Sequence, residues 1–154
     1  RVKRVTDKYY VPLIINDRLD ICLAVDAAGV HLGQTDLPCS EARRILGAEK
    51  IIGVSAATPE EAAKAQSDGA DYLGVGAVFA TSTKTNTRPV TAETIRAIRS
   101  AVDIPFVVIG GVNSENISGL HGLGINGAAV ISAIISQPDI TAAARKMRQA
   151  AERL

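Results

Sequence analysis

Short aliphatic runs recur six times along the chain, and amphipathic stretches separate them. Each run is about five residues long and is bounded by glycine or a polar residue, which is typical of a strand buried on both faces of a sheet. Regular alternation of such runs with helical stretches predicts a parallel sheet with right-handed crossovers. The runs are residues 12–16, 29–33, 51–55, 72–76, 106–110 and 128–132.

Helices are predicted between these runs. The clearest helix start is Thr58-Pro59-Glu60-Glu61, where Thr58 suits the N-cap, proline suits the first turn and Glu61 completes a capping box. Asp68-Gly69 is expected to end this helix. Residues 1–10 resemble the end of a further helix. The remaining predicted helices are residues 19–26, 41–46, 92–101, 115–123 and 138–152.

Two closures suit a parallel sheet of this kind, an open doubly wound sheet and a TIM (β/α)8 barrel. A barrel needs eight strands, and this chain supplies about six βα units. If the fold is a barrel, we expect the first two strands to be missing from this chain. No linker or low-complexity tract interrupts the pattern. We therefore predict one α/β domain over residues 1–154, an N-terminally incomplete barrel.

Composition narrows the class of protein. Aromatic residues are only 3% of the chain, so the core is expected to be aliphatic. The formal net charge of +1 gives no general attraction to nucleic acid or membranes. No apolar run approaches the roughly 20 residues of a membrane span, and no apolar stretch follows the basic residues 1–4 as in a signal peptide. Cys22 and Cys39 lack CxxC spacing and are expected to be buried and reduced, so we expect a cytoplasmic protein.

Polar residues follow the aliphatic runs, and in a parallel α/β fold these positions converge on the site. Asp17 and Asp36 follow the first and second runs. Two carboxylates without His or Cys partners favour Mg²⁺ over Zn²⁺. Each residue also has a structural interpretation, with Asp17 as the N-cap of the next helix and Asp36 as a turn residue.

The residues that follow the later aliphatic runs are typical of a phosphate-binding site. Thr81-Ser82-Thr83-Lys84 combines hydroxyls with a lysine, as phosphate cradles do, although an ordinary loop has the same composition. Gly110-Gly111 allows backbone amides to approach a ligand. Ser132 follows the last strand, where barrels commonly bind phosphate.

For each of three other polar residues, the sequence allows two interpretations. His31, inside the second run, suits either a hydrogen-bonded wall residue or a proton-transfer group. Ser55 suits a hydrogen bond to ligand better than a nucleophile, because no activating His and acid are evident. Arg88 suits either phosphate contact or cover for apolar surface.

Several of these segments, in order and over essentially the whole chain, resemble thiamine-phosphate synthases. The combination of Asn16-Asp17 with Gly33-Gln34-Thr35-Asp36 and Thr81-Ser82-Thr83-Lys84 is the specific feature. The other matching segments are residues 12–18, 29–36, 52–55, 69–76, 109–111 and 130–133.

The resemblance implies a TIM-barrel transferase of thiamine biosynthesis that joins an aminopyrimidine diphosphate to a thiazole phosphate, releasing pyrophosphate. Asp17 and Asp36 would bind Mg²⁺, and Lys84 and Ser55 would act at the diphosphate. The implied substrate-binding residues are Asn16, Ser55 and Lys84 for the aminopyrimidine diphosphate, and Thr81, Ser82, Thr83, Gly111, Ile131 and Ser132 for the thiazole phosphate.

One departure from the family matters. Its Gln/Arg/Lys cluster at the end of the second barrel strand is not in this sequence, so the activity of this chain alone stays open. Two alternatives also stay open: a thiazole tautomerase-type paralogue, which does not need the Mg²⁺ carboxylates, and a non-catalytic barrel that binds a phosphate ligand. A general phosphate-binding isomerase would need an acid–base group, for which His31 is the candidate. A homodimer is compatible with the sequence.

Overall fold

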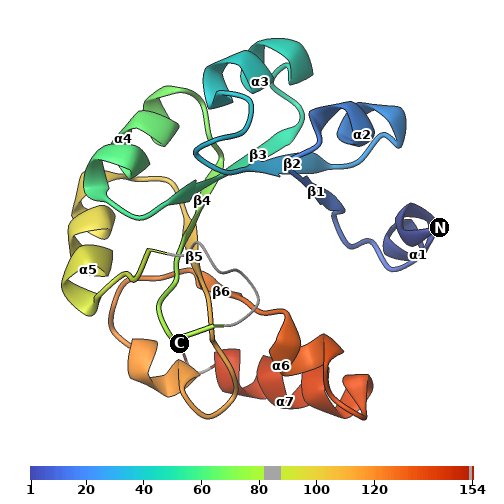
Figure 1. Cartoon of the computed structure of the whole chain (residues 1–154). Coiled ribbons are helices and arrows are strands. Elements are labelled where there is room, and N and C mark those ends of the chain that lie inside the picture. Colours follow the sequence, from blue (N-terminus) through green and yellow to red (C-terminus); the bar gives the residue numbers. More distant parts are fainter. Residues whose placement is uncertain (82–87, 153) are drawn as a thin grey trace.

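A computed structural model describes residues 1–81, 88–152 and 154 of the chain. Its centre is a parallel sheet of six strands in chain order, β1 to β6 (Figure 1). An open doubly wound sheet reverses its strand order at a switch point. This sheet does not, so it winds in one direction as a barrel does, and the fold is a partial TIM barrel. The strands are β1 Ile14–Asn16, β2 Gly29–Leu32, β3 Ile51–Ala56, β4 Tyr72–Gly76, β5 Phe106–Ile109 and β6 Gly127–Ala129.

Helices cover the outer side of the curved sheet (Figure 1). The helices between successive strands are α2 Leu19–Ala24, α3 Cys39–Leu46, α4 Pro59–Ser67 and α5 Ala92–Ala101. Helix α1, Val2–Lys8, lies beyond β1, while α6, Ser132–Ile135, and α7, Ile140–Ala151, follow β6. None of the helices in the described ranges is both long and apolar enough to cross a membrane.

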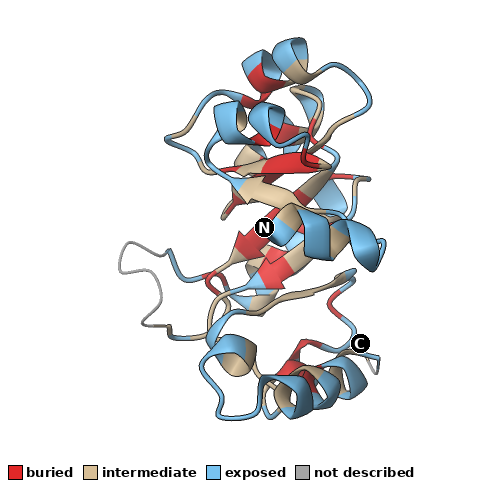
Figure 2. Ribbon diagram, turned by 90° about the vertical axis from the view of Figure 1, so that its right-hand side faces the viewer, coloured by how far each residue is buried: buried red, intermediate tan, exposed pale blue. Residues whose placement is uncertain are grey.

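The core is aliphatic, as the composition predicts. Its largest fully buried side chains include Leu32, Ile52 and Leu73 on the strands, with Phe106 on β5 as an aromatic member. Burying such a side chain stabilises the fold by roughly 1.5–3 kcal/mol. The strands are the most buried part of the molecule, and the outward faces of the helices are exposed (Figure 2). Cys22 and Cys39 are free and buried, as predicted.

The predicted start of α4 is confirmed, with one difference. Thr58 is the N-cap, and its hydroxyl accepts from the Glu61 N–H at 3.2 Å. The Glu61 carboxylate accepts from the N–H of Ala57, one residue before the cap, at 2.8 Å. Glu61 therefore fixes the connection that leaves β3.

Two helix predictions need correction. Residues 115–123 form only a short 3-10 turn, Ile117–Leu120. The Asn113 side chain caps the chain before this turn by accepting from the N–H groups of Glu115 and Asn116. The backbone then leaves the helical region at His121 and is left-handed at Gly122, with φ of 75°, which ends the turn early. The last helix begins at Ile140, not at residue 138, because Asp139 is its N-cap and accepts from Ala142. Helix α6 was not predicted.

Register brings the strand ends to one edge of the sheet. Asn16 pairs with His31 across β1 and β2, and Ile109 pairs with Ala129 across β5 and β6. The connections that follow paired strand ends lie next to each other. The described members of the polar set selected from the sequence therefore gather at this carboxyl edge.

Candidate active site at the carboxyl ends of the strands

The chain turns sharply after β1 at Asp17. This exposed residue has a left-handed backbone with φ of 63°, and its N–H donates to the His31 carbonyl at 2.8 Å. Such a conformation costs a non-glycine residue about 1 kcal/mol or more and is concentrated at functional sites. The interpretation of Asp17 as a helix N-cap is wrong, because Arg18 occupies the N-cap of α2, which has no side-chain cap.

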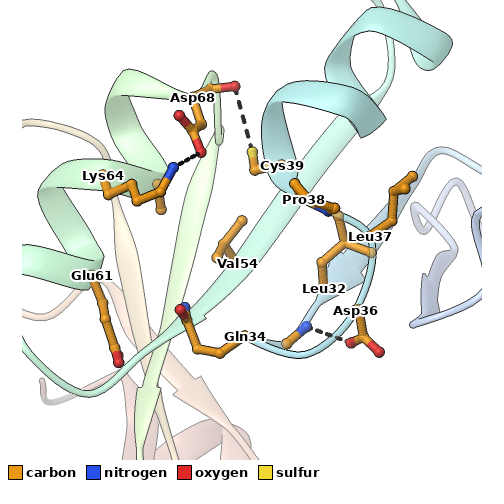
Figure 3. A pocket seen from close by; sticks show the side chains of 12 residues that line it. Leu32, Gln34, Asp36, Leu37, Pro38, Cys39, Val54, Glu61, Lys64 and Asp68 are labelled. Carbon is orange, nitrogen blue, oxygen red and sulfur yellow. Dashed lines mark hydrogen bonds and ion pairs between the residues drawn. The ribbon is translucent and has the colours of Figure 1, made fainter.

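Asp36 closes the turn that follows β2. Its Oδ2 accepts from the Gly33 N–H at 2.7 Å (Figure 3), and its own N–H donates to the Gly33 carbonyl at 3.3 Å. The interpretation as a turn residue is confirmed. Within the described part of the chain, Oδ1 of Asp36 makes no hydrogen bond. One carboxylate oxygen is thus available in a residue whose position the turn fixes.

The donor set fits a hard cation such as Mg²⁺. Asp17 and Asp36 follow the ends of paired strands and contribute carboxylate oxygens. In the described residues, no three His, Cys, Asp or Glu side chains gather into a metal-binding cluster. A cation at this edge would rely on few protein ligands and on water or substrate oxygens, a coordination that Mg²⁺ accepts.

Asn16 and Ser55 present polar groups at the same edge. Asn16 is exposed at the end of β1, and its side-chain amide makes no hydrogen bond to the described residues. Ser55, half-buried on β3, lies with Oγ 3.0 Å from His31 Nε2, and its carbonyl accepts from Gln34 Nε2 at 2.6 Å.

His31 is a hydrogen-bonded wall residue, as predicted. Its Nδ1 lies 3.0 Å from the Tyr72 hydroxyl, where a catalytic triad would have a carboxylate. This arrangement supports a binding role for Ser55 rather than a nucleophilic one.

Gly111 lies in the connection that follows β5, with φ of 67°. A Cβ at Gly111 would lie 2.4 Å from the Ala80 carbonyl oxygen, so the missing side chain makes room for the connection after β4. The Gly111 carbonyl accepts from Asn116 Nδ2 at 2.9 Å. Its N–H donates to no acceptor in the described residues. The glycine therefore serves packing while leaving one amide available to an anion.

The connection after β6 presents further donors. Ile131 and Ser132 are exposed, and α6 begins at Ser132. The Ile131 carbonyl accepts from Ile134 and Ile135. The N–H groups of Ser132 and Ala133 have no acceptor among the described residues. Because β5 and β6 pair, these amides and the Ser132 hydroxyl lie beside the Gly111 connection, and amides at a helix start suit a phosphate.

The predicted phosphate loop is described only at its ends. Thr81 is half-buried, whereas Ser82, Thr83 and Lys84 lie outside the described residues. At the far end, Arg88 donates from Nη1 and Nη2 to the two carboxylate oxygens of Glu61 at 2.7 and 2.8 Å. This bond to Arg88 lowers the pKa of the Glu61 carboxyl. Arg88, the first described residue after this segment, is thus bonded to α4.

A hollow of about 180 Å³ lies between α3 and α4, behind the Asp36 turn (Figure 3). At its rim Lys64 pairs with Asp68 at 2.6 Å. The Cys39 thiol donates to the Asp68 carbonyl at 3.6 Å, and burial raises the pKa of that thiol. Lys64, Asp68 and Cys39 at this rim are therefore bonded to each other.

Sequence reasoning missed two residues that organise this edge. Tyr72 was assigned only to a strand, although Gly53, which leaves room for the Tyr72 ring, signals a side chain crossing the sheet. Glu61 was assigned only to a capping box, and its bond to Arg88 spans 27 positions. No local pattern signals that bond.

Comparison with known proteins identifies the family of this chain. A family model described as thiamine monophosphate synthase matches residues 1–134. A thiamine-phosphate synthase from Ruminiclostridium cellulolyticum is 58% identical over 146 residues, which cover 95% of this chain and 70% of the relative. One from Clostridium beijerinckii is 51% identical, with 96% of this chain and 71% of the relative covered. The chain thus spans about 70% of the length of these relatives.

Solved structures show the same fold. Thiamine phosphate pyrophosphorylase from Pyrococcus furiosus matches with a TM-score of 0.89 and 40% identity, covering 97% of this chain and 71% of that one. A 3-hexulose-6-phosphate synthase matches with a TM-score of 0.65 at 22% identity, covering 86% of this chain and 66% of that one. The second likeness concerns the fold alone.

Proposed function

The chain belongs to the thiamine monophosphate synthase family, and from that premise we propose that its carboxyl edge binds two substrates and one Mg²⁺ ion. It is a thiamine-phosphate synthase, a transferase of thiamine biosynthesis. Its substrates are an aminopyrimidine diphosphate and a thiazole phosphate, and its products are thiamine monophosphate and pyrophosphate. The observation that supports the site assignment is the set of available donors, together with the available Oδ1 of Asp36, at the ends of paired strands in the described residues.

Asp17 and Asp36 are the proposed cation ligands. In support, Asp17 is not used to cap α2, and the turn that holds Asp36 leaves its Oδ1 available in the described residues. When bound, Mg²⁺ supplies positive charge that stabilises a departing diphosphate. Asn16, Ser55 and Lys84 are proposed to bind the same diphosphate through hydrogen bonds and, for Lys84, charge.

The thiazole phosphate is proposed to bind on the opposite side, between the connections after β5 and β6. The Gly111 N–H and the hydroxyl and N–H of Ser132 are the donors there, Ile131 shapes the contact, and Thr81, Ser82 and Thr83 add hydroxyls. Two anion sites on opposite sides would orient the substrates toward each other, which accounts for a large part of catalysis in bimolecular reactions.

The proposed chemistry needs no protein nucleophile. The thiazole nitrogen lone pair forms a bond to the methylene carbon of the pyrimidine, and the bond from that carbon to the diphosphate oxygen breaks. Its electron pair leaves with pyrophosphate. The protein groups hold both substrates and stabilise charge on the leaving group. This division of labour agrees with a Ser55 that bonds to His31, because the other ring nitrogen of His31 lies at the Tyr72 hydroxyl and not at a carboxylate.

We also propose a cytoplasmic location, supported by two cysteines that are free and buried. A homodimer stays a prediction from the sequence.

The activity test supplies both substrates with and without Mg²⁺ and measures pyrophosphate and thiamine monophosphate. Wild-type protein should form both products only with Mg²⁺. Asp17→Asn and Asp36→Asn should each lower turnover by about 100-fold or more, because the leaving group loses stabilisation of roughly 3 kcal/mol.

Asp20→Asn is the matched control, because Asp20 is exposed and pairs with Arg18 on α2. It should keep wild-type turnover. Absence of product under every condition, from wild-type protein that also carries the first two barrel strands, would refute the proposed activity. Wild-type behaviour of both Asp17→Asn and Asp36→Asn would refute the metal assignment alone.

A further inference from the structure

Three side chains form a continuous hydrogen-bonded array across the inner face of the sheet. His31 on β2 lies between Tyr72 on β4 and Ser55 on β3, with its Nδ1 3.0 Å from the Tyr72 hydroxyl and its Nε2 3.0 Å from Ser55 Oγ. Tyr72 and His31 also stack obliquely, with ring centroids 5.5 Å apart. The array therefore links a half-buried phenol to the Ser55 hydroxyl near the carboxyl end of β3.

The sheet is built to accommodate this array. Strand register aligns His31 with Gly53, and Gly53 with Tyr72. A Cβ at Gly53 would lie 2.1 Å from Tyr72 Cζ, and a Cβ at Gly74 would lie 2.9 Å from His31 Cε1. Both rings thus pass over strand positions that only glycine leaves open. The backbone of Ser55 is held separately by Gln34.

A neutral histidine has one donor and one acceptor nitrogen, so the array has two possible directions. In one, the Tyr72 hydroxyl donates to Nδ1 and Nε2–H donates to Ser55 Oγ, which leaves the Ser55 hydroxyl proton free to donate outward. In the other, Ser55 donates to Nε2 and presents only lone pairs outward. Only the first direction suits an anionic ligand, and hydrogen bonds arranged in series strengthen one another.

We propose that Tyr72 and His31 are positioning residues that direct the Ser55 hydroxyl proton toward an oxygen of the pyrimidine diphosphate, with His31 in its Nε2–H form. The proposal rests on the proposed function for the identity of the anion. The direction of the array itself does not depend on activity. Burial raises the pKa of Tyr72, which keeps this phenol protonated as the first donor.

The direction of the array can be measured by ¹⁵N NMR in the free protein. The chain has two histidines, His31 and the exposed His121, so His121→Gln assigns the signals. His31 should show a protonated Nε2 and an unprotonated Nδ1. Tyr72→Phe should shift the Nδ1 signal, because the hydroxyl that bonds to it is removed. A protonated Nδ1 with an unprotonated Nε2 would overturn the proposal.

Activity then tests whether the array acts through Ser55. Tyr72→Phe should lower kcat/KM for the pyrimidine diphosphate about fivefold, which corresponds to about 1 kcal/mol, and should leave KM for the thiazole phosphate unchanged. In a Ser55→Ala background the same substitution should have no effect, because the group that it positions is absent. Tyr10→Phe, at a tyrosine that is 95% exposed, is the control.

An equal loss in both backgrounds would mean that Tyr72 supports the fold and not the Ser55 hydroxyl, and would overturn the positioning role. Absence of turnover in the wild-type protein would instead refute the proposed function, and the NMR result would still decide the direction of the array.

Discussion

The two ends of the strands use polar side chains in opposite ways. At the amino end, polar groups bond to one another and to the backbone and join consecutive βα units. At the carboxyl end, several N–H donors and one carboxylate oxygen, Oδ1 of Asp36, have no hydrogen-bond partner within the described residues. In TIM barrels the first face maintains the fold and the second carries the chemistry. Within one small sheet, polar groups that are hydrogen-bonded to each other mark the face that maintains the fold, and polar groups without a partner in the described residues mark the face that carries the chemistry.

Arg43 is the clearest case at the amino end. From α3 it donates to the carbonyls of Gly47, Lys50 and Gly69 and to the Asp71 carboxylate, at 2.6–3.0 Å. Asp71 also accepts from the Ile52 N–H at 2.7 Å. One guanidinium thus joins the ends of α3 and α4 to the starts of β3 and β4. Other side chains repeat this pattern: Lys50 bonds to Asp26 and Ala27, Gln66 to Asp103 and Ile104, and Asn126 to Phe106.

The largest expected effect on stability is at Arg43. Arg43→Met removes five hydrogen bonds and should lower the free energy of unfolding by about 3 kcal/mol, which lowers Tm by about 10 °C in a domain of this size. The folded protein should keep its turnover. Chemical denaturation and an activity assay measure the two quantities.

Arg44 provides the matched control, because Glu41, on the exposed side of α3, is its one ion-pair partner among the described residues. Arg44→Met should change stability by less than about 0.5 kcal/mol. If the two methionine variants were equally stable, the amino end would not have the structural role assigned to it.

Asn16 should show the opposite pattern at the carboxyl end. Its side chain is exposed and has no hydrogen bond in the described residues, so Asn16→Ala should leave the free energy of unfolding within about 0.5 kcal/mol of wild type. It should lower kcat/KM for the pyrimidine diphosphate about tenfold, since one hydrogen bond to a charged ligand is lost. If Asn16→Ala lowered the stability and left the activity unchanged, Asn16 would have the structural role that the amino end is proposed to have.

The smallest effect is expected at the Glu61–Arg88 pair, which belongs to the carboxyl end but has both partners engaged. A double-mutant cycle with Glu61→Gln and Arg88→Ala should give a coupling below about 1 kcal/mol at neutral pH, because the Arg88 side chain is 57% exposed.

The pH dependence of this coupling has a definite sign. Arg88 lowers the pKa of Glu61 from 4.5, so the stabilisation is complete above about pH 4.5 and is lost as the pH falls through the folded-state pKa. Urea titrations between pH 3 and 7 measure it. A coupling that grows as the pH falls would exclude the charged pair.

The periodicity of the sequence was sufficient to predict the six strands of the sheet. The six aliphatic runs overlap the six strands, and reading the residues after each run located Asp17, Ser55, Gly111 and Ser132 at one edge. The boundaries that failed were decided by local backbone conformation, as where the left-handed Gly122 and Gly124, with φ of 75° and 72°, follow a turn that was expected to extend to residue 123.

The contacts that organise the site could not be predicted from the sequence, because they join residues that are far apart along the chain. The bonds of His31 to Tyr72 and of Glu61 to Arg88 join residues 41 and 27 positions apart. Strand register and the path of a connection decide which of many polar residues meet, and neither is encoded in a local pattern. Lys84 and its neighbours at 82 and 83 lie outside the described residues, so their assignment stays a prediction.

The central claim is that Asp17 and Asp36 hold one divalent cation together. The most direct measurement is binding of Mn²⁺, used in place of Mg²⁺, in the presence of inorganic pyrophosphate and followed by the electron paramagnetic resonance of the free ion. Wild-type protein and Asp20→Asn should bind one ion equally well, and Asp17→Asn and Asp36→Asn should each bind it at least about tenfold more weakly. Equal binding by the wild-type protein and every variant would contradict the account.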